Sequence, residues 1–170
     1  MSEALRSNEN IHNKLRMQLL SGLLSREDFL TALMDLDQAE PSRAASIKNV
    51  DLLTQPEIQA FFLGSEAESS YCFNLGFAYF HKAQISEFEN GQGLSDFKNS
   101  LEMTLKSGKR EDDWVRYIKA TIAYLENNSD SLKELIQPGD ANELLLRNMV
   151  KGLETRGAPS YFEDYSAPRN

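Results

Sequence analysis

The sequence predicts an all-α protein, a bundle of seven to eight helices arranged as stacked antiparallel hairpins. Apolar residues recur at steps of three and four along almost every segment, and no convincing run alternates with a period of two. A chain of 170 residues, 41% of them hydrophobic, can bury one core without help from a disulfide or a metal. The five prolines all lie at breaks between the periodic segments: Pro41, Pro56, Pro138, Pro159 and Pro168. We therefore expect one helical domain over residues 1–156 and a C-terminal tail over residues 157–170.

Residues 1–40 are predicted to form an N-terminal helical hairpin. The first helix covers about residues 9–21, and Gly22 follows it, as glycine often does after a helix C-terminus. Ser25, with Asp28 three residues later, is close to a capping box and starts the second helix. Each helix carries an apolar stripe, with Ile11, Leu15 and Leu19 on the first and Phe29, Leu30, Leu33 and Leu36 on the second.

Part of this hairpin, LRMQLLSGLLSREDF, resembles a short bacterial oligomerisation motif of the form L-x-x-G-x-I-S-x-E-E-F. Any tight turn of the type helix–Gly–Ser–helix gives the same pattern. The resemblance implies self-association, and a homodimer is therefore one of the assemblies considered for this chain.

Three helices are predicted next. The first covers about residues 42–53, and Pro56 suits the first position of the second, which ends near Gly64. Ser65 then caps a long helix over about residues 66–89, which the glycine-containing stretch ENGQG ends.

The remaining helices are shorter. One begins at Ser95, another covers about residues 112–126, and the segment SLKELI forms a third. Asp140 and Glu143 make a capping box for a last helix over about residues 141–155. The tail, RGAPSYFEDYSAPRN, shows no helical pattern.

Two helices in the middle of the chain can be aligned with each other at an offset of 45 residues. Each opens a predicted helix–turn–helix pair, and repeats of about this length usually form stacked helical hairpins. Residues 66–136 are therefore predicted to be a repeat-like core. The alignment pairs Phe73 with Ile118, Phe77 with Ile122, Ala78 with Ala123, Tyr79 with Tyr124, and Phe80 with Leu125.

The first of these helices contains the run Leu75-Gly76-x-Ala78-Tyr79, which resembles the Leu-Gly-x-x-Tyr signature of the tetratricopeptide repeat family. The resemblance covers about residues 68–136 and implies a degenerate tetratricopeptide-like helical bundle that binds proteins or peptides. The chain departs from the family in its period of 45 residues, in extra residues in the first turn and in the missing proline between repeats.

The resemblance also implies which neighbours the stretch NLGFAYFHKA, residues 74–83, meets. Gly76 would let this helix approach its hairpin partner closely. The groove side would be apolar throughout, so either the N-terminal helices fill the groove or it stays open for an amphipathic partner helix. The residues expected to bind a partner in the groove are Phe73, Phe77, Phe80, Ile118 and Ile122.

The tail adds three aromatic residues among acids: Tyr161, Phe162 and Tyr165. A tail that served only solubility would rarely carry three aromatic side chains. Either the tail docks back on the domain or it is a short recognition segment, and we include its aromatic residues among the expected partner-binding positions.

Catalytic, cofactor and metal sites are not indicated. Zinc sites usually need three or four Cys, His or carboxylate ligands at characteristic spacing, which His12, His81 and the single cysteine do not provide. His81 is expected to border the core, and Cys72 to be a small buried hydrophobic residue. We therefore expect a protein that is not an enzyme and needs no cofactor.

The charge of the chain limits the classes of partner. A net charge of -8 argues against nucleic acid and against anionic membranes, since both require clustered Lys and Arg. A polar N-terminus and one cysteine favour a cytoplasmic location. The leading interpretation is a protein–protein interaction module, namely an adaptor, scaffold or chaperone whose partner is another protein or peptide. The alternative is an acidic inhibitor or immunity-type protein that blocks a basic partner, for example a nucleic-acid-binding one.

Overall fold

The computed structural model describes residues 3–110 and 112–169. Within these residues the chain forms ten α-helices and no strand, which confirms the predicted all-α class. The helices are α1 Glu3–Leu20, α2 Arg26–Ala39, α3 Ala45–Leu53, α4 Pro56–Phe62, α5 Glu68–Asn90, α6 Leu94–Lys106, α7 Asp113–Leu125, α8 Ser129–Leu135, α9 Glu143–Arg156 and α10 Tyr161–Ser166.

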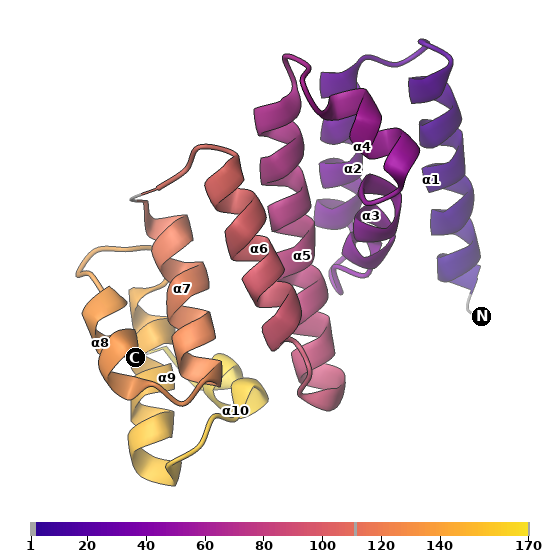
Figure 1. Ribbon diagram of the computed structural model, residues 1–170. Helices are drawn as coiled ribbons and strands as arrows, with labels where there is room; N and C mark the ends of the chain where they lie inside the picture. Colours follow the sequence, from indigo (N-terminus) through magenta and orange to yellow (C-terminus); the bar gives the residue numbers. More distant parts are fainter. Residues whose placement is uncertain (1–2, 111, 170) are drawn as a thin grey trace.

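The helices form a stack that follows the order of the chain (Figure 1). Helices α1–α4 lie at one end, α5 and α6 run side by side in the middle, and α7–α10 lie at the other end. The described part has ten helices instead of seven to eight, and of these only α10 lies in a segment where the sequence predicts no helix. Within the described residues, no helix combines the length and apolar character that crossing a membrane requires.

Side-chain caps fix the starts of α2 and α7, and the first of these caps is the one that the sequence predicts. The Ser25 hydroxyl accepts the Asp28 N–H at 3.1 Å, and the Asp112 carboxylate accepts the Val115 N–H at 2.8 Å. Each bond satisfies a backbone donor that the first turn of a helix leaves without a partner.

The caps predicted from Ser65 and Asp140 are wrong. Helix α5 begins only at Glu68, because the Ser65 hydroxyl bonds Phe62 O and Ala67 N within a preceding turn. The Asp140 side chain does not cap α9, because its carboxylate instead accepts two hydrogen bonds of 2.9 Å from Arg116.

Gly76 lies at the crossing of α5 and α6, as the sequence predicts. A Cβ atom at this position would lie 2.6 Å from Thr104 Oγ1 and 3.1 Å from the Ser100 carbonyl oxygen. The Ser100 hydroxyl also donates a 2.6 Å hydrogen bond to the Gly76 carbonyl across the crossing. Only a residue without a side chain allows the two helices to lie this close.

Two hydrophobic cores lie on either side of the α5–α6 pair. The first joins the N-terminal helices to one face of α5 and includes Leu19, Phe29, Leu33, Tyr71 and Leu75. The second joins the later part of α5 to α6–α10 and includes Phe80, Phe97, Ile118, Tyr124, Met149 and Tyr161. Helix α5 therefore contributes to both cores, as its apolar circumference requires.

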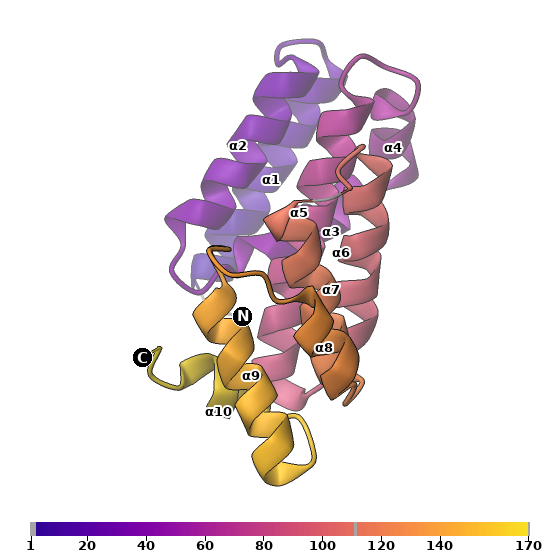
Figure 2. The same cartoon turned by 90° about the vertical axis from the view of Figure 1, so that its left-hand side faces the viewer.

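The tail folds back onto the helical body, so the prediction that it lacks helix is wrong. Tyr161 in α10 is only 4% exposed, and its ring lies 5.3 Å from Phe88 in α5. Figure 2 shows α10 beside α9, at the end of the molecule that carries the C-terminus. The helical pattern is hard to see in the sequence because α10 has six residues and buries a carboxylate, that of Asp164.

A buried polar network holds α10 in place. Asp164 accepts a 2.5 Å hydrogen bond from the Tyr124 hydroxyl and two from the Arg156 guanidinium. The Tyr124 oxygen in turn accepts the Ser160 N–H at 2.7 Å. Gly152 makes room for this carboxylate, because a Cβ atom there would lie 2.0 Å from it.

The close α5–α6 crossing predicts that Gly76→Leu destabilises the protein. The new side chain would overpack the contact with Thr104 and Ser100, at a cost of about 1–3 kcal/mol. Ala60→Leu, at an exposed position of α4, is the control and should leave the melting temperature nearly unchanged. Thermal unfolding measures both. An increased melting temperature for Gly76→Leu would contradict the close crossing, since leucine has the higher helix propensity by about 0.8 kcal/mol.

The network around Asp164 predicts that the tail depends on this one carboxylate. Asp164→Ala leaves the Tyr124 hydroxyl and Arg156 without their buried acceptor, which should cost about 1–3 kcal/mol. Its neighbour Glu163→Ala is the control, because that exposed side chain forms only a surface ion pair with Arg156, worth about 0–1 kcal/mol. Urea denaturation gives the stabilities, and limited proteolysis reports release of the tail. Equal behaviour of the two variants would contradict a docked α10.

Candidate functional site

A cleft of about 730 Å³ lies between α5, α7, α10 and the loop that joins α2 to α3. The walls come from segments that are distant in the sequence, with Arg43 in the loop, Phe80 and Phe88 in α5, Trp114 in α7 and Tyr165 in α10. The volume falls within the range of about 300–1,000 Å³ that is usual for ligand sites.

Aromatic rings from α5 and α7 form one wall of the cleft. The Phe80 ring centroid lies 4.8 Å from that of Trp114 and 5.1 Å from that of Tyr117. Phe77 packs behind them, 5.7 Å from Trp114. The spacing of three residues in each helix places Phe77 and Phe80, like Trp114 and Tyr117, on neighbouring turns of one face.

The tail supplies the opposite aromatic wall. Tyr165 lines the cleft and lies 5.4 Å from the Phe88 ring. Tyr161 stands behind it at 5.4 Å, and the Gln84 side-chain N–H₂ donates a 3.0 Å hydrogen bond to the Tyr161 hydroxyl oxygen. Burial raises the pKa of both Tyr117 and Tyr161 above the ordinary tyrosine value.

A buried carboxylate anchors Arg43 and His81, two lining residues of the cleft. Asp37 in α2 is 1% exposed, and its Oδ2 lies 2.7 Å from His81 Nδ1 and 3.6 Å from Arg43 Nη1. The His81 and Phe77 rings also form a T-shaped contact, with their centroids 4.4 Å apart. This cluster ties α2 and the following loop to α5, and so sets the width of the cleft at this side.

Four of the eight residues predicted to bind a partner are at the cleft or directly behind it. Phe80 and Tyr165 line it, Phe77 packs against Trp114, and Tyr161 packs behind Tyr165.

The other four predicted residues lie elsewhere. Ile118 is 0% exposed in the second core, and Ile122 packs against the same core. Phe73 stacks on Phe77 at 6.3 Å, with Lys109 over its ring. Phe162 is 64% exposed and meets the outer edge of Phe88. The eight residues therefore do not form one groove.

The N-terminal hairpin does not cover the expected groove. Its residues Leu19, Phe29 and Leu33 belong to the first core, on the side of α5 that carries Tyr71 and Leu75. The apolar positions of α7 are instead covered by α9 and α10, which add Met149, Leu153 and Tyr161 to the second core.

Several residues that line the cleft could not be identified as site residues from the sequence. Arg43 reaches it only because the Asp37–His81 pair joins segments 44 positions apart. Gln84, Ile85 and Glu89 follow Phe77, Phe80 and His81 along the same face of α5. Helical periodicity from Phe80 could have identified that face, although not what lies opposite it.

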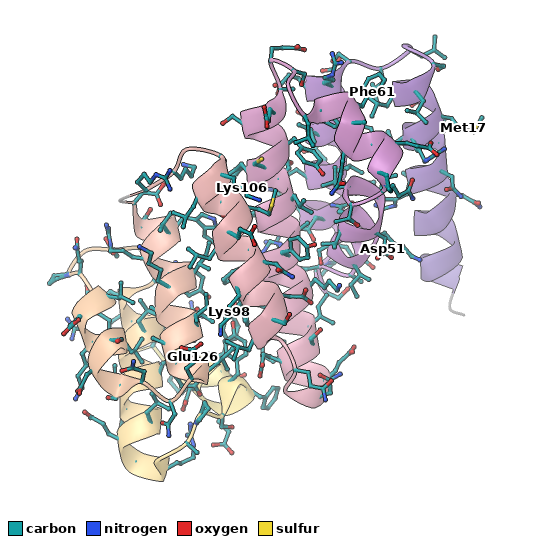
Figure 3. All side chains as sticks on the ribbon, in the orientation of Figure 1. Met17, Asp51, Phe61, Lys98, Lys106 and Glu126 are labelled. Carbon is teal, nitrogen blue, oxygen red and sulfur yellow. The ribbon has the colours of Figure 1, made fainter. Side chains whose placement is uncertain are left out.

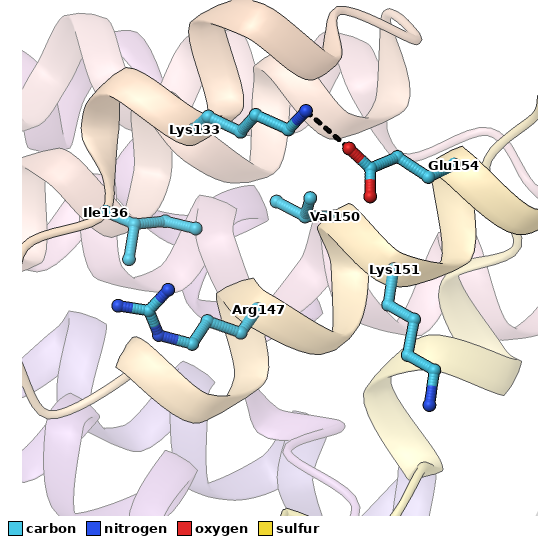
Figure 4. A pocket seen from close by; sticks show the side chains of 6 residues that line it. All are labelled: Lys133, Ile136, Arg147, Val150, Lys151 and Glu154. Carbon is cyan, nitrogen blue, oxygen red and sulfur yellow. Dashed lines mark ion pairs between the residues drawn. The ribbon is translucent and has the colours of Figure 1, made fainter.

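A second, shallower pocket of about 380 Å³ lies between α8 and α9 (Figure 4). Its cations are largely neutralised, since Lys133 pairs with Glu154 and Arg147 with Glu143. Only Ile136 and Val150 give it an apolar floor. The aromatic cleft is therefore the stronger candidate for a functional site.

The described residues contain no group of three or more His, Cys, Asp or Glu side chains placed to hold a metal ion. Cys72 is buried and unbonded, and burial raises the pKa of its thiol. Both histidines bond other helices, His81 to Asp37 and His12 to Asn49. The chain matches no protein-family model, no curated protein and no solved structure.

Proposed function

We propose that the protein is a non-catalytic interaction module that binds a short segment of another protein in the aromatic cleft. The observation that supports this most directly is the composition of the cleft. Five of its lining residues are aromatic, and they come from three helices: Phe80, Phe88, Trp114, Tyr117 and Tyr165.

Aromatic side chains suit this task for two reasons. Trp and Tyr are enriched among the few residues that carry most of the binding energy of an interface, and they lose little conformational entropy on binding. The walls are also held before any partner arrives, on one side by the Asp37 cluster and on the other by the Asp164 network. A pre-formed site avoids part of the ordering cost of association.

The proposal keeps the tetratricopeptide-like arrangement as its structural basis. The α5–α6 and α7–α8 pairs would be two degenerate hairpins, with the cleft on the side of their first helices. An adaptor, scaffold or chaperone of the reducing cytoplasm fits a protein whose single cysteine is buried and unbonded.

The distribution of charge favours this function over the acidic inhibitor. Carboxylates that form ion pairs come from widely separated parts of the stack, among them Glu57, Glu102, Glu126 and Glu154. Figure 3 shows one such pair, in which Lys98 of α6 and Glu126 after α7 point toward each other. A nucleic-acid mimic would gather its acids, largely unpaired, on one face.

Self-association belongs to the proposal as a separate property. The helix α1 and the turn after it carry exposed apolar side chains, of which Met17 is 68% and Leu23 is 81% exposed. Met17 points away from the body of the protein (Figure 3). Two copies could bury these side chains against each other, and light scattering on the purified protein would detect the dimer.

Selection of peptides from a random display library tests the proposed function. The protein has a single tryptophan, and Trp114 lies in the cleft, so its fluorescence reports whether a selected peptide binds there. We expect selected peptides to shift this emission. Phe88→Ala should lower the affinity of these peptides by about fivefold or more, because it removes an aromatic contact worth over about 1 kcal/mol.

Leu144→Ala is the matched control for Phe88→Ala. Leu144 is 47% exposed and Phe88 is 41% exposed, but Leu144 lies on α9 outside the cleft. The control should leave peptide affinity unchanged. Selected peptides that leave the Trp114 emission constant, or that bind both variants as tightly as the parent protein, would contradict the proposed function.

A further inference from the structure

The chain places one of its own cations on the aromatic wall of the cleft. The guanidinium carbon of Arg169 lies 5.5 Å from the centroid of the Tyr165 ring. Tyr165 lines the cleft, and Phe88 packs beside it at 5.4 Å. A cation within about 6 Å of an aromatic face is attracted by the negative charge density of that face. A guanidinium group of the chain therefore already lies against one of the rings that line the cleft.

The fixed charges of the cleft do not oppose a second cation. Arg43 lies 3.6 Å from the buried Asp37 carboxylate, which offsets its positive charge. Glu89, on the last turn of α5, is the one carboxylate among the lining residues. Glu89 is exposed and makes no ion pair within the part of the chain that the structure describes.

The charge of the whole protein acts in the same direction. A net charge of -8 attracts positively charged segments from a distance and speeds their encounter with the protein. Close to the cleft, Glu89 would then accept hydrogen bonds from a guanidinium that stacks on Tyr165 and Phe88.

We propose that the segment bound in the cleft is basic, and that one of its arginine side chains stacks on Tyr165 and Phe88 and pairs with Glu89. This inference rests on the proposed function and names the chemistry of its partner. Arg169 occupies the same aromatic wall until the partner displaces it. Arginine suits the position better than lysine, because its planar, weakly hydrated guanidinium stacks on rings and bonds a carboxylate with two N–H groups.

Acetylated, amidated tetra-arginine is the probe, with tetra-lysine and tetra-glutamate for comparison. Titration of Trp114 fluorescence and isothermal calorimetry measure binding to the full chain. We expect affinities in the order arginine, lysine, glutamate. Binding should weaken as ionic strength rises from about 0.01 M to about 1 M, since the screening length falls from about 30 Å to about 3 Å.

Charge variants separate a local effect from the net charge. Glu89→Lys should weaken tetra-arginine binding by about fivefold or more, because it replaces the paired carboxylate by a like charge. Glu134→Lys is the matched control, with the same change in net charge at an exposed position of α8 outside the cleft. Equal losses for the two variants would overturn the inference.

Ring variants test the stacking. Tyr165→Phe keeps the aromatic face and should retain affinity, whereas Tyr165→Leu keeps an apolar side chain without that face and should lose about two- to fivefold. Arg169→Ala removes the internal competitor and should strengthen binding by a similar factor. Thermal melts confirm that each variant folds. If Tyr165→Leu or Arg169→Ala leaves the affinity for tetra-arginine unchanged, the assigned contact is wrong.

The two proposals fail in different ways. If library peptides bind at Trp114 but are not basic, and tetra-glutamate binds as well as tetra-arginine, the inference about charge is wrong and the proposed function stands. If no peptide of any charge binds at Trp114, the proposed function is wrong and the inference falls with it.

Discussion

The long helix α5 must be buried on two sides at once, and the arrangement of the other helices follows from this. Its first half packs in one core with the N-terminal helices, and its second half in another core with the C-terminal helices. Helix α6 occupies a third side, where Gly76 permits a close approach. A helix that carries apolar residues around most of its circumference has few stable alternatives, because every uncovered face would expose apolar surface to water.

The side of α5 that remains faces the cleft. Here the chain does not close a core but holds two walls apart, with the carboxylate of Asp37, which pairs with Arg43, at one edge and a docked tail at the other. Burial of Asp37 and Asp164 would be costly without their cationic and hydroxyl partners. Each carboxylate therefore fixes a segment in one position, which an apolar contact of the same size would define less sharply.

Features that depend on neighbouring residues could be predicted from the sequence. The cap at Ser25 needs only the next three residues, and the role of Gly76 follows from its place in an apolar helical stripe. Features that depend on contacts between residues distant in the sequence could not be predicted from it. The Asp37–His81 contact joins positions 44 apart, and neither residue type implies the other. Helix α10 escaped prediction because its buried face includes Asp164, so its pattern is not one of apolar residues alone.

The fit between Gly152 and Asp164 has a consequence for how this sequence can change over evolutionary time. The carboxylate occupies the space that any side chain at position 152 would need. Replacement of the glycine would displace the carboxylate, and loss of the carboxylate would remove the reason for the glycine. The two positions should therefore vary together among descendants of this gene, with alanine or serine admitted at position 152 only where position 164 has already lost its acid. Tyr124 and Arg156, which bond the same carboxylate, would be released from constraint at that moment as well.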